Sequence, residues 1–288
     1  VMSEYRAVEV PDGLSGERLD AAMARMFGLS RTKAAELIDD GHVQLNGADG
    51  TRSQRVEIDD FIEVTFPLER DPLEVRAELV DGLNVVYDDP DFVVVDKPVG
   101  VAAHPSQGWD GATVLGGLAG LGYRIATGGA PERQGIVHRL DVGTSGLMVV
   151  AKSEWAYSHI KQQFRDRTVE KIYHTLVHGR LDPLTGTIDA PIGRHPHHDF
   201  KFAVMAGGRE SVTHYETVEA FAHASLLEVH LETGRTHQIR VHMSAMRHPC
   251  VGDEMYGADP TLAQKLGLTR QWLHACELEI EHPSSGQR

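Results

Sequence analysis

The sequence predicts an α+β protein in two parts, a small amino-terminal unit and a larger, strand-rich unit. Three observations support this. The first 66 residues carry two helix-period apolar patterns followed by alternation of strand type. Beyond residue 84, short apolar runs of strand length recur. The 288 residues are enough for one large domain and one small one. We place the units at 1–75 and 76–288, with a charged linker over 67–84.

The amino-terminal unit is bounded by clear start and stop signals. Gly28 ends a first helix that has Leu19 and Met23 on its inner face. Ser30 can cap a second helix, which Gly41 ends. An Asn46-Gly47 pair then predicts a tight turn between strands. These signals indicate a compact unit of two helices and a small sheet.

The most informative stretch of the larger unit is GIVHRLDVGTSGLMVVAK, residues 135–152. Apolar flanks that we interpret as buried strands enclose His138, Arg139 and Asp141 and a glycine-containing loop. A carboxylate at the end of a buried strand has two interpretations from its position alone. One is a buried salt bridge or a turn-capping aspartate, and the other is a reactive carboxylate in a cleft.

The remaining elements bring further polar side chains toward this stretch. Residues 153–165 have the spacing of a helix, and the following strand contains Tyr173, either a core tyrosine or an aromatic platform for a base. A strand over 226–231 leads into a predicted helix from Thr236, and Arg235 stands at the corner between them. The last strand has Leu273 on its buried side.

Composition narrows the class of protein. The net charge of −14 is uneven: residues 54–96 hold thirteen acidic and three basic side chains, whereas residues 131–180 hold eight basic and five acidic ones. A basic face that attracts a polyanion is therefore compatible with an acidic chain. No apolar run is long enough to cross a bilayer, and the first residues do not resemble a signal peptide. Two cysteines without metal-type spacing suit reduced residues in a cytoplasmic protein.

The sequence does not favour either of two common kinds of cofactor site. No GxGxxG stands between a strand and a helix, and no phosphate-loop signature occurs, so a nucleotide cofactor is not indicated. His195, His197 and His198 raise a zinc hypothesis, but Pro196 breaks helical ligand spacing and no HExxH arrangement supports it. These histidines lie beside Arg194, Lys201 and Arg209, which favours a polynucleotide path instead. We expect no metal and no organic cofactor.

The stretch RLDAAMARMFGLSRTKAAELIDDGHVQLNG in the first unit resembles the alpha-L RNA-binding module of a ribosomal protein. Arg31 and Lys33 stand at the start of the second helix, where helix amides and basic side chains suit a phosphate. The resemblance implies that they bind RNA.

Three ordered stretches of the larger unit, HRLDVGTSGLMVVAK, KIYHTLV and GRTHQIRVHMSAMRHPCVGDEMYG, together resemble the RluA/RluD-type pseudouridine synthases. The likeness covers nearly all of residues 85–282, and the amino-terminal module further resembles the RluC and RluD side. It implies a pseudouridine synthase fold, a mixed and largely antiparallel sheet with peripheral helices and a cleft lined by the three motifs. The sequence ends with HPSSGQR, residues 282–288, slightly short of many members of this type, so we expect a few terminal residues to be missing.

The resemblance also assigns roles. Asp141 matches the catalytic aspartate, and Arg235 matches the arginine paired with it. Tyr173 matches the tyrosine that stacks on the target base and can help to remove the proton from carbon 5. Arg139 matches the residue that replaces the flipped-out base, and substrate contacts are implied for His138 and Leu273.

The implied function is isomerisation of uridine to pseudouridine in RNA, with large-subunit ribosomal RNA or its assembling particle as partner. We expect a cytoplasmic monomer without a membrane partner. Two other hypotheses remain open from sequence: a non-catalytic RNA-binding or ribosome-assembly factor, and a metal-dependent hydrolase built on the histidines.

Overall fold

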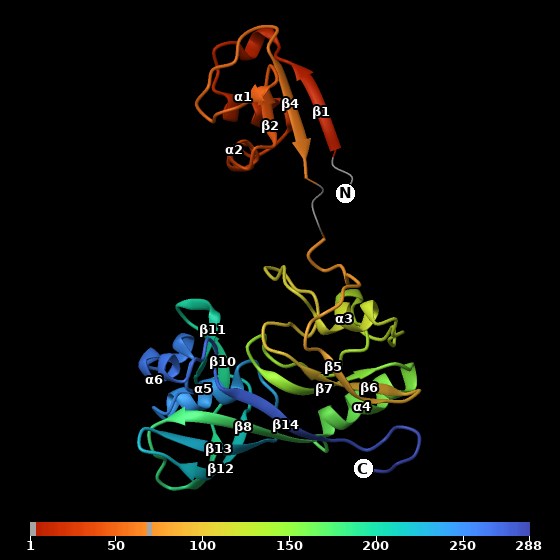
Figure 1. The fold of residues 1–288 in the computed structure, drawn as a ribbon, viewed down its shortest axis with the longest axis vertical. Helices are drawn as coiled ribbons and strands as arrows, with labels where there is room; N and C mark the ends of the chain where they lie inside the picture. The colour runs from red at the N-terminus through yellow and green to blue at the C-terminus, as the bar shows by residue number, and fades with distance from the viewer. Residues whose placement is uncertain (1–3, 68–70) are drawn as a thin grey trace. The chain divides into compact units, whose positions relative to one another are not determined.

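A computed structural model describes residues 4–67 and 71–288 and divides the chain into two compact units that meet between Asp71 and Pro72 (Figure 1). The predicted boundary after residue 75 falls inside the second unit. The predicted linker is wrong for residues 72–84, because Val75 and Val80 pack against the core of that unit and Leu83 is buried in it. The Glu78 amide also donates a hydrogen bond to the Gly116 carbonyl (3.1 Å). Residues 68–70 lie outside the described residues.

The first unit confirms the predicted pair of helices over a small sheet. Gly28 follows the first helix in the left-handed conformation (φ 67°), and the Ser30 hydroxyl caps the second helix by accepting a hydrogen bond from the Lys33 amide (3.1 Å). The sheet is antiparallel, in the order β1-β4-β2-β3. The elements are β1 (Glu4–Glu9), a 3-10 turn (Asp12–Leu14), α1 (Leu19–Phe27), α2 (Arg31–Asp39), β2 (Val43–Leu45), β3 (Ala48–Asp49) and β4 (Phe61–Phe66).

The second unit is built on an eight-stranded sheet in the order β5-β6-β7-β14-β8-β13-β12-β9. Its strands are β5 (Asn84–Asp88), β6 (Phe92–Lys97), β7 (Ser145–Ala151), β8 (Glu170–His178), β9 (Thr185–Asp189), β12 (Val212–Ala220), β13 (Ala224–Leu231) and β14 (Leu273–Glu279). A separate hairpin joins β10 (Ile192–His195) to β11 (His198–Val204). Around these lie α3 (Val114–Gly120), α4 (Glu154–Asp166), α5 (Gln238–Ala245) and α6 (Pro260–Lys265), with short 3-10 turns at Pro131–Arg133 and Glu254–Tyr256. The predicted mixed, largely antiparallel sheet is confirmed.

The last strand in sequence, β14, lies in the sheet between β7 and β8, although β7 and β8 are consecutive strands along the chain. It pairs parallel to β7 and antiparallel to β8. Gly146 of β7 has φ 115°, and a Cβ at this position would collide with the backbone of Ala275 on β14. Only glycine therefore permits this close approach of the two strands. The insertion of β14 brings its first residue, Leu273, to the pocket that Asp141 also lines.

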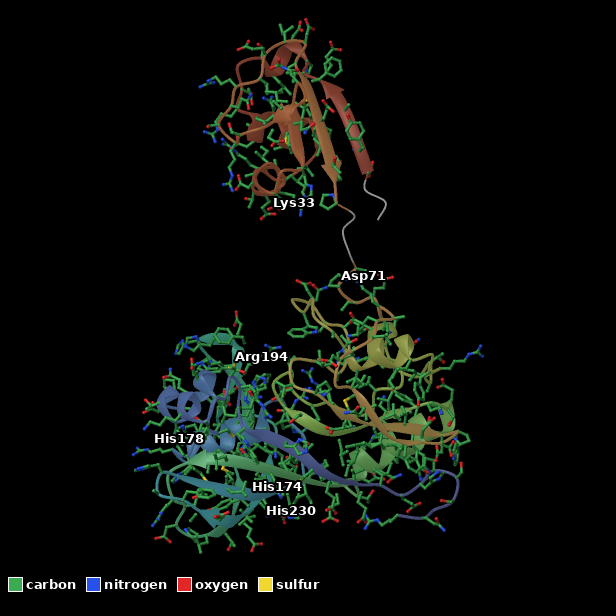
Figure 2. The ribbon with its side chains drawn as sticks, viewed as in Figure 1. Lys33, Asp71, His174, His178, Arg194 and His230 are labelled. Atoms are coloured by element: carbon green, nitrogen blue, oxygen red, sulfur yellow. The ribbon has the colours of Figure 1, made fainter. Side chains whose placement is uncertain are left out.

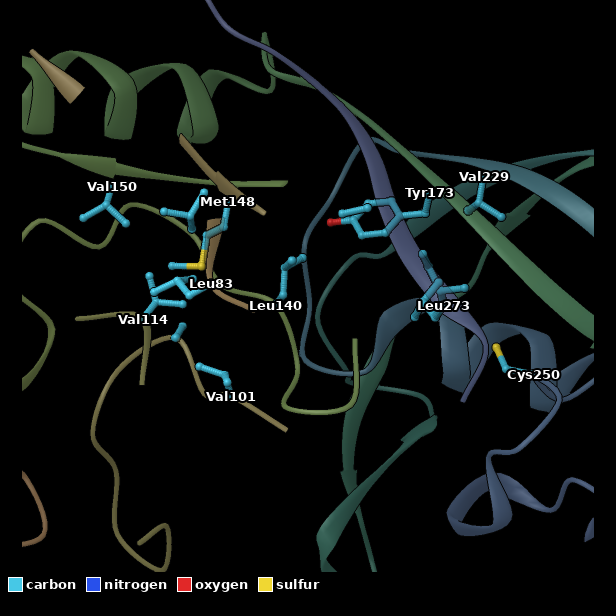
Figure 3. Packing of buried hydrophobic residues seen from close by; sticks show 14 of the residues in the cluster. Leu83, Val101, Val114, Leu140, Met148, Val150, Tyr173, Val229, Cys250 and Leu273 are labelled. Atoms are coloured by element: carbon cyan, nitrogen blue, oxygen red, sulfur yellow. The ribbon is translucent and has the colours of Figure 1, made fainter. Parts of the chain in front are cut away.

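The two faces of the sheet have different surroundings. Met148 and Val150 of β7 face the main core, whereas Val149 and Ala151 face α4. On β8, Tyr173 joins the main core, and the next residue, His174, lies on the opposite face. There His174 and His230 both contact the Glu228 carboxylate, at 3.6 and 3.0 Å (Figure 2). The main core, part of which is drawn in Figure 3, covers the face of the sheet on which Tyr173 lies.

One predicted strand is absent. The first flank of the 135–152 stretch, Ile136 and Val137, is not a strand. Ile136 alone forms an isolated bridge to Val150. The second flank is β7, as predicted.

Candidate active site

Asp141 lies in a loop whose backbone is hydrogen-bonded to a buried lysine. Lys97, at the end of β6, is fully buried, and its Nζ donates to the carbonyls of Val101 (2.7 Å), Pro98 (3.0 Å) and Val142 (3.4 Å). The Gly100 amide donates to the same Val142 carbonyl (2.9 Å). Burial lowers the pKa of Lys97 to about 8. These bonds fix the residue immediately after Asp141 and so restrict where the carboxylate can lie.

The partner of the Asp141 carboxylate is Arg240. Arg240 Nη1 lies 3.4 Å from Asp141 Oδ2, and His237 Nε2 lies 3.9 Å from the same oxygen. The predicted ion pair between Asp141 and Arg235 is wrong. Arg235 precedes α5 and uses its Nε to donate to the Glu210 carbonyl (3.0 Å), whereas Arg240 extends from the first turns of α5.

Arg240 is shared between two carboxylates. Its Nε and Nη2 form a two-pronged contact with Asp253, at 2.6 and 2.9 Å, and its side chain is only 7% exposed. The ring of Tyr256 lies beneath the guanidinium, 4.9 Å from centroid to carbon. Its neighbouring carboxylates raise the pKa of Arg240 against the lowering effect of burial. The guanidinium is therefore a permanent, fixed positive charge beside Asp141.

A buried amide fixes the turn between β13 and α5. Gln238 donates to the Val212 carbonyl (3.0 Å) and the Thr213 hydroxyl (2.9 Å). Its carbonyl oxygen accepts from the Thr233 hydroxyl (2.7 Å) and the Arg235 amide (3.0 Å). All hydrogen-bonding positions of this side chain are thus engaged inside the fold, which holds the turn in one conformation.

Tyr173 and Leu273 form the apolar wall of the site. They lie on the neighbouring strands β8 and β14, both buried, with their side chains in the same core cluster (Figure 3). Burial and the nearby Asp141 charge raise the pKa of the Tyr173 phenol, so this side chain is a neutral phenol at physiological pH. Tyr173 and Leu273 line one pocket together with polar groups from the other motifs. Its lining residues are Arg139, Leu140, Asp141, Thr144, Tyr173, Leu231, Gly234, Arg235, Thr236, His237, Gln238, Ile239, Arg240 and Leu273.

Not all predicted substrate contacts lie in this pocket. Arg139 is exposed and lines it, as does Leu273, but His138 is structural. The His138 ring stacks on Phe164 of α4 (centroids 4.7 Å apart), and its Nε2 accepts a hydrogen bond from the Val149 amide (3.0 Å). The prediction that His138 contacts substrate is therefore wrong, because its ring packs on the α4 side of the sheet, where Val137 also lies, and does not line the pocket.

The remaining predicted groups lie elsewhere. In the first unit, Arg31 contacts Asp20 (3.4 Å) and Lys33 contacts Glu36 (3.9 Å), and both basic side chains are exposed. His195 and His198 belong to the β10–β11 hairpin, whose Arg194 is labelled in Figure 2. Within residues 4–67 and 71–288, no three His, Cys, Asp or Glu side chains form a group that could hold a metal ion.

Sequence reasoning missed Arg240, Asp253, His237 and Tyr256. A signal for Arg240 was present, since it lies among Ile239, Val241 and Met243 in a helix predicted to bury its apolar residues. A charged residue in such a helix needs a buried partner of opposite charge. The sequence does not show whether Asp141 or Asp253 is that partner, and the structure shows that both are.

The arrangement is a half-buried carboxylate held by a fixed arginine beside a buried aromatic ring and an exposed arginine. The RNA pseudouridylate synthase family model matches residues 91–245, more than half of the chain, and includes Asp141, Tyr173 and Arg240. The chain belongs to the RNA pseudouridylate synthase family. An S4 domain model matches residues 17–62, within the first unit.

Individual relatives agree with this assignment. The chain is 58% identical to an uncharacterized RNA pseudouridine synthase of Mycobacterium bovis over 98% of this chain and 92% of the relative. It is 41% identical to the ribosomal large subunit pseudouridine synthase D of Nitrosomonas europaea, over 96% and 81%. The structure of human RNA pseudouridylate synthase domain containing 1 superposes with a TM-score of 0.57 at 30% identity, covering 71% of this chain and 81% of the human one.

The protein is thus an RNA pseudouridine synthase with an S4 domain. None of the helices in the described residues is long and apolar enough to cross a membrane.

Proposed function

We propose that this RNA pseudouridine synthase isomerises specific uridines of large-subunit ribosomal RNA, with Asp141 as the reacting carboxylate. Support for the RNA comes from relatives at about 40% identity that are named as ribosomal large subunit pseudouridine synthase D. These relatives come from bacteria, where ribosomal particles are assembled in the cytoplasm, so the proposal also assigns the enzyme to that compartment.

The observation that supports the proposed chemistry best is the position of the Asp141 carboxylate. It is 16% exposed at the side chain, contacts a fixed arginine through one oxygen, and lies in the same pocket as Tyr173. The reaction breaks the bond between sugar carbon 1′ and uracil N1 and forms a bond from carbon 1′ to carbon 5. Carbon 5 loses its proton to solvent and N1 gains one, so the atoms balance. The reaction needs one group that can act as nucleophile or base beside the glycosidic bond, and no net redox change. Asp141 is the acidic side chain that lines the pocket.

Tyr173 and Arg139 have complementary roles in this proposal. A uridine inside folded RNA must leave its stack, at a cost of a few kcal/mol. Stacking on the Tyr173 ring would return about 1–3 kcal/mol. The exposed Arg139 guanidinium would then occupy the space left by the base. Since the Tyr173 phenol has a raised pKa, we assign it to stacking rather than to proton abstraction as a phenolate.

The test is release of tritium from uridine carbon 5. The substrate is RNA from cells that lack this protein and were grown with uridine tritiated at that carbon. We expect the wild type to release tritium and Asp141→Asn, which keeps the shape of the side chain but loses its charge, to release none above background. Equal release by the two proteins would refute the role of Asp141.

The identity of the RNA needs a separate experiment. Mapping pseudouridines in large-subunit ribosomal RNA from cells with and without the protein should show positions that depend on it. If the only dependent positions are in transfer RNA, the ribosomal substrate is wrong although the reaction is unaffected.

A further inference from the structure

Both contacts to the Asp141 carboxylate end on one oxygen. Arg240 Nη1 and His237 Nε2 approach Oδ2, at 3.4 and 3.9 Å. Among the described residues, no protein group donates a hydrogen bond to Oδ1. The two carboxylate oxygens therefore differ: Oδ2 faces Arg240 and His237, and Oδ1 has no hydrogen bond from a described residue.

The hydrogen bonds around Tyr256 favour one tautomer of His237. The Tyr256 hydroxyl oxygen accepts from the Phe202 amide (3.1 Å), and it lies 2.7 Å from His237 Nδ1. A backbone amide can only donate, so the hydroxyl proton remains available for one acceptor, and Nδ1 is the acceptor within reach. When Nδ1 accepts, the proton of the neutral imidazole must be on Nε2, which faces Asp141.

The His237 ring is held on several sides. Its backbone is left-handed (φ 57°), an uncommon conformation for a residue with a side chain, and it immediately precedes α5. The rings of Phe202 and Tyr256 both meet it edge to face, with centroids 5.7 and 5.6 Å away. Burial lowers the pKa of His237, which favours the neutral form. Strained backbone at a site is retained where it sets a geometry that the site needs.

We propose that His237 is a positioning residue for the Asp141 carboxylate: Tyr256 sets its tautomer, and its Nε2–H faces Oδ2 from 3.9 Å, outside hydrogen-bond distance, so that its dipole and the Arg240 charge attract Oδ2 and leave Oδ1 to react with the nucleotide. The chain of contacts runs from the Phe202 amide through the Tyr256 hydroxyl and the His237 ring to Asp141. This inference rests on the proposed role of Asp141.

Two substitutions of His237 separate positioning from structural support. The amide nitrogen of a glutamine can reach approximately the position of Nε2, whereas that of an asparagine reaches only that of Nδ1. Asparagine, however, tolerates the left-handed backbone better than glutamine does. If His237 only supports the turn, His237→Asn should be at least as active as His237→Gln. If it positions Asp141, His237→Gln should be the faster enzyme.

We expect single-turnover tritium release to fall about 100-fold in His237→Asn, the loss that a small misplacement of a reacting group causes. His237→Gln should stay within about tenfold of the wild type. The Kd for RNA should not differ between the two variants, because both place an uncharged amide at the same pocket-lining position. An asparagine variant as fast as the glutamine variant would overturn the proposal.

Tyr256→Phe tests the same chain from its other end. It removes one hydroxyl, keeps the ring beneath Arg240, and should slow release about tenfold in the wild type but not further in His237→Asn. Tyr215→Phe is the control, since it removes the hydroxyl of another buried tyrosine, which lies 3.4 Å from the Pro183 carbonyl, away from the pocket. Equal effects of Tyr256→Phe in both backgrounds would overturn the proposal.

Two further outcomes are distinguishable. If the His237 variants do not fold, Tyr256→Phe against Tyr215→Phe decides: a tenfold loss in the first alone supports positioning, and equal rates refute it. If the wild type releases no tritium, or Asp141→Asn releases as much as the wild type, the proposed function itself has failed.

Discussion

At the scale of single residues, Arg240 carries the charge that balances two carboxylates where little water reaches. Asp253 is 2% exposed at the side chain and Asp141 is 16% exposed. Removing the arginine would leave Asp253 buried without its counter-charge, and breaking such a pair costs far more than losing a surface ion pair. Stability and site geometry therefore depend on the same side chain.

Arg240→Met should destabilise the protein by about 3–5 kcal/mol, the usual cost of an uncompensated buried charge. Arg235→Met is the matched control, because Arg235 is partly exposed and its side-chain hydrogen bond goes to a carbonyl. It should cost about 1 kcal/mol. Urea unfolding of both variants measures the difference, and equal losses would contradict the assignment of Arg240.

The sequence could show that an arginine near GRTHQIR should meet Asp141, but not which one. Arg235 and Arg240 are both near the start of α5, and the choice depends on a turn that Gln238 fixes through contacts to Val212 and Thr213. Such contacts join segments far apart in the chain and have no local pattern. Asp141 and Tyr173 could be predicted because each lies in a stretch, HRLDVGTSGLMVVAK or KIYHTLV, whose resemblance to the family assigns it directly.

His138 gives a pH-dependent prediction. Burial lowers its pKa from 6.5 to about 3, and its Nε2 must be unprotonated to accept from the Val149 amide. Between these pH values the unfolded chain binds a proton that the folded protein does not. Stability therefore falls as pH falls from 6.5, by up to about 1.4 kcal/mol per unit from this residue.

The comparison is with His138→Gln, whose amide oxygen can accept the same hydrogen bond and does not titrate. Unfolding free energies at several pH values from 7 to 4.5 should decline more steeply for the wild type than for the variant. Parallel curves would show that His138 does not contribute to the acid sensitivity.

At the scale of elements, the site depends on β14 lying between β7 and β8. The parallel pair β7–β14 is short, with His274 opposite Ser145 and Ala275 opposite Gly146. The Ser145 hydroxyl also lies 3.0 Å from His274 Nδ1. The sequence predicts each strand by its apolar pattern, but strand order depends on long-range pairing that periodicity does not encode. A glycine inside a strand was the local sign of close approach.

Gly146→Ala should be strongly destabilising, by about 2–5 kcal/mol, since it combines left-handed strain with overpacking against Ala275. Gly207→Ala is the control: its φ is +80° and nothing lies within 4 Å of an added Cβ. It should cost only the strain, about 1–2 kcal/mol. Comparable melting temperatures for the two variants would show that the β7–β14 approach is not tight.

At the scale of the whole molecule, the boundary between the two units lies before residue 72 and not within the charged segment that follows it. Residues 72–83 belong to the second unit, since Val75, Val80 and Leu83 pack into its core. The fit is close: a Cβ on Gly116 or Gly120 of α3 would collide with the carbonyls of Arg76 and Glu78. Two features made this segment resemble a linker. It is highly charged, and its few apolar residues have neither helix nor strand spacing.

This packing determines where the chain can be divided. Removing residues 1–71 leaves the core of the second unit and every residue of the pocket in place. We expect that shortened protein to fold, to bind RNA at least about tenfold more weakly because a second binding module is lost, and to release tritium from saturating RNA at nearly the full rate. Filter binding and single-turnover release on the same RNA give the two quantities.

A second truncation, removing residues 1–84, is the control for the position of the cut. It also removes Leu83, whose burial alone is worth about 2–5 kcal/mol, together with Val75, Val80 and the Glu78 amide that bonds to Gly116. We expect this protein not to fold. Unchanged RNA affinity in the first truncation would contradict the role of the S4 domain, and a folded, active second truncation would contradict the packing of residues 72–83. Only if both expectations hold does the first unit supply affinity while the second supplies the chemistry.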